Sequence, residues 1–135
     1  MKIKRVEHVA IAVNSLNESV RMLRETFGIP LEYEDQVGST RLAMMPVGET
    51  YIEFLEGRGE DNAVNQWIAA RGIGLYHICF EVEDIAAALA ELKSKGVKLK
   101  DEIPRIGHGG AKIAFIDPAC TGNVLIELAE LRSGH

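Results

Sequence analysis

The sequence predicts an α+β fold of two tandem βαβββ modules, whose sheets either face each other or roll into one open barrel, and a repeated pattern carries this prediction. The stretch V-E-H-V-A-I-A-V at residues 6–13 returns as L-Y-H-I-C-F-E-V at residues 75–82, with a histidine third in each copy. Each half then ends on a strand that reads I-E-x-x-E, at residues 52–56 and 126–130. Matching residues at matching places indicate that one structural unit has been duplicated.

The first module is expected over about residues 4–56. In the opening stretch, bulky aliphatic residues alternate with small residues and His8, which is typical of a strand with two different faces. A capping pattern of Ser15 and Glu18 and an apolar stripe predict a helix over about residues 16–27, ended by Gly28. Strands are then expected at 31–33, 41–45 and 51–55, with a loop at 35–39.

A linker helix over about residues 61–72 and a second module over about 74–130 complete what we predict to be a single domain, residues 1–135. Asp84 is expected to cap the helix of this module, and Gly96 to end it. Its strands are expected at 76–82, 97–99, 112–116 and 124–128. The Gly-containing stretch 103–110 is the least regular part of the chain, and a loop is expected there.

Charge and composition exclude several partners. The net charge of −5 and the absence of a basic patch argue against binding to nucleic acid or to an anionic membrane. No apolar run is long enough to span a bilayer, and Glu7 and His8 interrupt any signal-peptide core. Cys79 and Cys120 lack a paired-motif spacing, so we interpret them as free thiols of a cytoplasmic protein.

Strand alternation places one His and one Glu of each module on the face opposite its helix. The four residues are His8, Glu53, His77 and Glu127. One strand His or one strand Glu is usually structural, but its recurrence at equivalent places favours a common role. A buried unpaired carboxylate is costly, and a divalent cation such as Co²⁺, Ni²⁺, Zn²⁺, Mn²⁺ or Fe²⁺ removes that cost.

These residues and their neighbours carry a resemblance to a known family. The stretches are H-V-A-I-A-V from residue 8, G-E-T-Y-I-E-F-L-E from 48, H-I-C-F-E-V from 77, G-G-A-K-I-A-F from 109, and V-L-I-E-L from 124. In this order and spacing, the whole chain resembles the vicinal oxygen chelate (glyoxalase) superfamily and, within it, the methylmalonyl-CoA epimerases. The resemblance implies the fold of that superfamily, in which two tandem βαβββ modules form an open curved sheet with a cleft.

The resemblance also implies a reaction. A divalent ion, Co²⁺ favoured, would be bound by His8, Glu53, His77 and Glu127, and Glu127 would double as an acid/base. The substrate would be an acyl-CoA thioester, epimerised between (2R)- and (2S)-methylmalonyl-CoA through a metal-bound enolate, in a homodimer. Some epimerases have a second catalytic Glu where this chain has Leu42, so the opposite acid is open between Glu53 and a metal-bound water.

Two alternative functions stay open at this point. Glyoxalase I (lactoylglutathione lyase) resembles this chain in the same ligand set, and a metal-free small-molecule-binding protein can share the fold. The loop at residues 107–110, with Arg105 and Lys112 beside it, is either an anion-binding element or a flexible connection. His108 and His135 are interpreted as non-ligands.

Overall fold

The computed structural model describes residues 1–132 and divides the chain into two compact units. The N-terminal unit is His8–Tyr76. The C-terminal unit combines Met1–Glu7 with the chain from His77 onward. The strands β1 (Ile3–Ala12) and β5 (Gly74–Val82) therefore each contribute to both units. That the whole chain forms one domain stays a prediction.

The sheet of the N-terminal unit runs in the order β2-β3-β4-β1. Its other strands are β2 (Tyr33–Val37), β3 (Thr40–Val47) and β4 (Thr50–Gly57). β4 lies parallel to β1, with Glu53 opposite Ala10, and antiparallel to β3, with Glu53 opposite Met44. Residues directly opposite each other share a face, so Ala10 and Met44 flank the carboxylate of Glu53 on this sheet.

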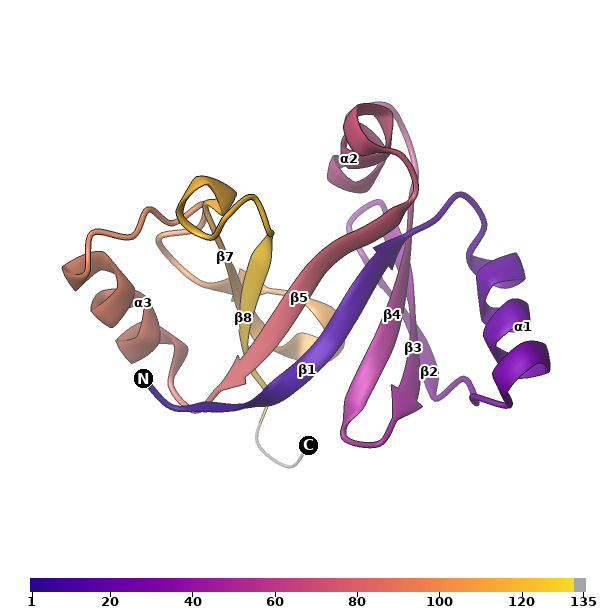
Figure 1. Ribbon diagram of the computed structural model, residues 1–135, viewed down its shortest axis with the longest axis horizontal. Helices are drawn as coiled ribbons and strands as arrows, with labels where there is room; N and C mark the ends of the chain where they lie inside the picture. The colour runs from indigo at the N-terminus through magenta and orange to yellow at the C-terminus, as the bar shows by residue number, and fades with distance from the viewer. Residues whose placement is uncertain (133–135) are drawn as a thin grey trace. The chain divides into compact units, whose positions relative to one another are not determined.

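Helix α1 (Leu16–Phe27) covers the other face of this sheet by packing on β3 and β4 (Figure 1). The hydroxyl of Ser15 accepts the N–H of Glu18, and Gly28 ends the helix at a φ of 70° in the left-handed conformation. The buried contacts of this face come from Leu16, Val20, Ala43, Met45 and Phe54. The predicted helix and the face that it covers are both confirmed.

The face that carries Glu53 is largely filled with apolar side chains. Its buried cluster consists of Ala10, Ala12, Leu42, Met44, Leu55 and Val64. Val64 comes from α2 (Ala63–Arg71), which packs on β4 and is capped by the side chain of Asn62. The small side chain of Ala12 is thus covered by residues of the neighbouring strands and of α2.

The sheet of the C-terminal unit runs in the order β5-β8-β7-β6. Its strands after β5 are β6 (Arg105–Ile106), β7 (Lys112–Ile116) and β8 (Ile126–Glu130). β8 lies parallel to β5, with Glu127 opposite Cys79, and antiparallel to β7, with Glu127 opposite Phe115. Glu127 thus occupies in this unit the register position that Glu53 occupies in the other.

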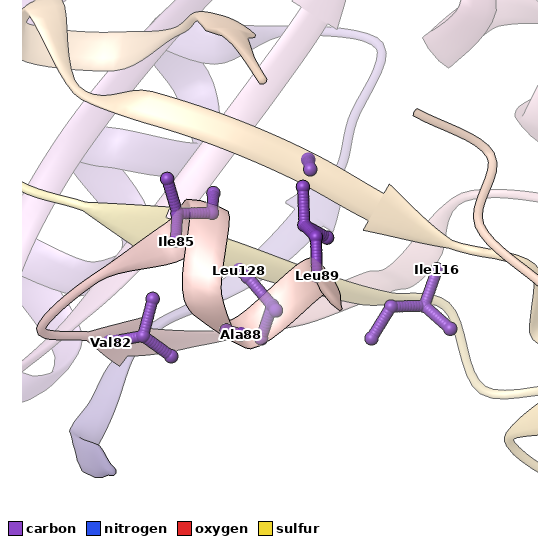
Figure 2. Close-up of a cluster of buried hydrophobic side chains, with 7 residues drawn as sticks. Val82, Ile85, Ala88, Leu89, Ile116 and Leu128 are labelled. Atoms are coloured by element: carbon purple, nitrogen blue, oxygen red, sulfur yellow. The ribbon is translucent and has the colours of Figure 1, made fainter. Parts of the chain in front are cut away.

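Helix α3 (Ile85–Ser94) covers the opposite face of that sheet. Asp84 caps it by accepting the N–H of Ala87, as predicted. Figure 2 shows Ala88 and Leu89 of the helix packed with Ile116 and Leu128 of the strands, in the core of this unit. Helices α1 and α3 therefore cover the sheet faces opposite those that carry Glu53 and Glu127.

Three expectations about strands were wrong. β2 continues to Val37, into the predicted loop 35–39, because an edge strand tolerates polar residues on its solvent side. Residues 97–99 form no strand: Leu99 makes an isolated bridge to Ile116, while Val97 and Leu99 pack against the core under α3. β6 instead lies within the predicted loop 103–110 and is followed by a 3-10 turn at His108–Gly110.

None of the helices among residues 1–132 is long and apolar enough to cross a membrane.

Candidate active site

The N-terminal unit brings two of the predicted site residues together. Nε2 of His8 lies 3.2 Å from Oε1 of Glu53. His8 is fully buried, and Glu53 is 3% exposed. Because Ala10 is the residue opposite Glu53, His8 stands two positions earlier on the parallel strand and reaches the carboxylate diagonally.

The C-terminal unit repeats this arrangement. Nε2 of His77 lies 3.0 Å from Oε1 of Glu127, and both side chains are buried. Cys79 is the residue opposite Glu127, so His77 again stands two positions earlier on the parallel strand. The strand repeat seen in the sequence is therefore a repeat of side-chain geometry, with one histidine and one glutamate in contact in each unit.

Each pair has the donors and the spacing that a divalent cation requires. Imidazole nitrogen and carboxylate oxygen are donors that divalent cations such as Co²⁺ and Zn²⁺ prefer. Nε2 and Oε1 lie 3.2 Å apart in one pair and 3.0 Å apart in the other, close enough for one ion to bind both atoms of a pair. The residues present fit a metal.

The surroundings of the two glutamates differ. Glu53 lies between Ala10 and Met44. Glu127 lies between Cys79 and Phe115. The ring of Phe115 meets that of His77 edge-on, with centroids 5.1 Å apart and an angle of 82°. The aromatic contact restrains the His77 ring beside Glu127, and the sequence pattern did not indicate it.

Leu42 lies in the apolar core of the N-terminal unit. It is opposite Leu55 on β4 and is 3% exposed. The register neighbours of Glu53 are Ala10 and Met44, so no second carboxylate stands beside Glu53 in these strand pairs.

The predicted loop contains a buried contact that sequence reasoning missed. Nε2 of His108 lies 3.1 Å from Oε1 of Glu7, and both residues are buried. Arg5 lies close by: its Nη2 is 3.9 Å from Glu7, and its Nε donates to Glu81 at 2.6 Å. His108 is thus anchored to β1 by a carboxylate. Residues 7 and 108 are 101 positions apart, and no local pattern indicates their contact. His135 lies outside the described residues.

Both cysteines are free thiols, as predicted. Cys79 is buried next to Glu127, and Cys120 is exposed.

With this geometry in hand, comparison with known proteins places the chain in a family. The model of the Glyoxalase/Bleomycin resistance protein/Dioxygenase superfamily matches residues 7–115, and the chain belongs to this superfamily. The predicted fold class is confirmed.

The similar proteins include several epimerases. The ethylmalonyl-CoA/methylmalonyl-CoA epimerase of Cereibacter sphaeroides is 34% identical over 96% of this chain and 99% of its own length. A methylmalonyl-CoA epimerase solved in complex with methylmalonyl-CoA and NH4+ is 31% identical, with a TM-score of 0.93 over 98% of this chain and 97% of that chain. A probable lactoylglutathione lyase of Synechocystis is 29% identical over 82% of this chain and 84% of its length. The predicted resemblance to methylmalonyl-CoA epimerases, which are isomerases, is confirmed.

Proposed function

We propose that this chain interconverts (2R)- and (2S)-methylmalonyl-CoA by removing the proton at C2 and returning one to the opposite face. The observation that carries the proposal is the pair of buried His–Glu contacts at equivalent register, one in each unit. End-to-end similarity to epimerases supports an acyl-CoA thioester as the substrate.

The metal part of the proposal concerns the same four residues. His8, Glu53, His77 and Glu127 would hold one divalent cation, for which Co²⁺ is our first candidate. When bound, such an ion supplies Lewis-acid chemistry that stabilises negative charge on the thioester oxygen as the C2 proton leaves.

The protein's own carboxylates would move the proton. Glu127 would take it from C2, because the carboxylate is buried and is held by His77, whose ring Phe115 restrains. Glu53 is our candidate for the acid on the opposite face, since it holds the equivalent register position and Leu42 offers no proton. The apolar neighbours Met44 and Phe115 would exclude water from the reacting carbon.

Two substrates separate the proposal from its main rival. Metal-loaded protein is supplied with (2S)-methylmalonyl-CoA and, separately, with the hemithioacetal of methylglyoxal and glutathione. We expect inversion of the first and no isomerisation of the second. Turnover of the hemithioacetal alone would assign a glyoxalase I activity, and binding without turnover of either would favour a binding protein.

The assembly and location of the protein stay predictions. We propose a homodimer, which light scattering on the purified chain checks directly. The cytoplasmic location predicted from the cysteines is likewise not tested by the structure.

A further inference from the structure

Arg105 lies on the face of the C-terminal sheet that carries Glu127. It is opposite Ile113 in the pairing of β6 with β7, so its side chain shares a face with Ile113 and with Phe115 two residues on. Phe115 in turn is opposite Glu127. From strand spacing and rise, the Cα atoms of Arg105 and Glu127 are about 12 Å apart, which a long side chain and a thioester substrate can bridge.

One carboxylate holds Arg105 in place beside this aromatic ring. Nε of Arg105 donates to Oδ1 of Asp101 at 3.2 Å, and Oδ2 of Asp101 accepts the backbone N–H of Phe115 at 2.8 Å. Cζ of Arg105 lies 5.5 Å from the centre of the Phe115 ring. The guanidinium therefore lies near the same ring that contacts His77.

The outer nitrogens of this guanidinium remain available. With Nε engaged, neither Nη of Arg105 has an acceptor among residues 1–132, and the side chain is 52% exposed. Arg5 differs, because it is 25% exposed and faces both Glu7 and Glu81. A planar guanidinium with two adjacent donors matches two oxygens of one carboxylate or phosphate.

We propose that Arg105 binds an anionic oxygen group of the substrate and so positions the thioester beside Glu127. The inference rests on the proposed function for the identity of that substrate. Methylmalonyl-CoA offers this chemistry twice, in the carboxylate on C2 and in the phosphates of the CoA moiety. Arg105 is in this account a substrate-binding residue that sets specificity for anionic thioesters.

The test measures binding to metal-loaded protein by calorimetry with three probes: methylmalonyl-CoA, propionyl-CoA and the N-acetylcysteamine thioester of methylmalonic acid. Arg105→Met should weaken the binding of methylmalonyl-CoA about tenfold or more. If the partner is a phosphate, propionyl-CoA is also weakened and the N-acetylcysteamine thioester is not. If it is the C2 carboxylate, the pattern of these two probes reverses.

Lys112→Met is the matched control. Lys112 is opposite Ile106, on the other face of the sheet, and its ammonium lies 4.0 Å from Glu130. The Lys112→Met substitution removes one positive charge, as Arg105→Met does, but on the face opposite Glu127. We therefore expect unchanged binding of all three probes. In turnover assays Arg105→Met should raise KM about tenfold while kcat changes by less than about threefold.

Equal binding of all three probes to wild type and Arg105→Met would overturn the inference, as would equal losses in Lys112→Met. If wild-type protein binds methylmalonyl-CoA but does not invert it, the proposed function fails, while a loss in Arg105→Met alone still supports the anion site. Wild-type protein that binds none of the thioesters would contradict both.

Discussion

The two His–Glu pairs are alike in geometry and unlike in their surroundings. In each, the histidine stands two positions before the residue opposite the glutamate, and Nε2 lies 3.0 or 3.2 Å from Oε1. Around Glu53 the neighbours are aliphatic or thioether side chains, packed with Leu42 and Leu55. Around Glu127 they are a thiol and an aromatic ring, with Asp101 and Arg105 beyond the ring.

This difference suggests how a duplicated unit can acquire two roles. Metal ligands need only the shared geometry, which both units retain. Under the proposed function, Glu127 removes the C2 proton and Arg105 binds an anionic group of the substrate, and both residues lie in the C-terminal unit. We therefore expect matched changes of the two glutamates to have unequal effects on proton exchange, and matched changes of the two histidines to have equal effects on metal binding.

The largest expected effect is the contrast between Glu127→Gln and Glu53→Gln. An amide can still offer an oxygen to a metal but cannot take a proton. Glu127→Gln should lower exchange of the epimer whose C2 proton faces Glu127 by about 10³-fold, within the range for loss of a general base. Glu53→Gln should keep exchange of that same epimer within about tenfold of wild type and lose most of the inversion.

Chiral analysis of the thioester combined with mass spectrometry measures exchange and inversion separately. Full inversion by Glu53→Gln would show that another group supplies the second proton. Equal loss of exchange in both variants would remove the proposed division of roles.

The buried contact between Glu7 and His108 provides a stability test within the C-terminal unit. His108→Leu removes the imidazole that faces the buried Glu7 carboxylate while Arg5 stays near it, which should cost about 1–3 kcal/mol in the free energy of unfolding. Adding Glu7→Gln to that variant should recover more than half of the loss, because the buried charge is gone. Urea unfolding measures both changes, and a loss below about 1 kcal/mol for His108→Leu would mean that Glu7 has other sufficient partners.

The pair geometry predicts equal effects for the two histidines on metal binding. One divalent ion per chain is expected, and Co²⁺ at 100 times its Kd should stabilise the folded protein by about 2.7 kcal/mol. His8→Ala and His77→Ala should each weaken the binding of Co²⁺ by a similar factor, about tenfold or more. Calorimetric titration and thermal unfolding with and without Co²⁺ check this. Tight binding of two ions per chain, or full Co²⁺ affinity in either variant, would contradict a four-residue site.

The sequence supported the helices and the glutamate faces because their signals are local. Ser15, Asn62 and Asp84 cap helices through bonds to N–H groups two or three residues away, and strand alternation sorts Glu53 and Glu127 from their bulky neighbours. The repeat then linked each histidine to its glutamate.

The remaining features depend on pairings between distant residues. A two-residue strand such as β6 has almost no pattern of its own, and it exists because β7 offers an edge. The side-chain series Asp101, Arg105, Phe115 and His77 follows from that register. The same holds for Glu7 and His108, whose contact joins the first strand to a turn 101 positions later.

Solvent deuterium incorporation at C2 of methylmalonyl-CoA tests the central claim most directly. Metal-loaded wild-type protein in deuterated buffer should place one deuterium at C2 and yield both epimers, whichever one is supplied. The Glu127→Gln protein, prepared and loaded in the same way, serves as the background. Incorporation by wild type no greater than in that variant would contradict the account.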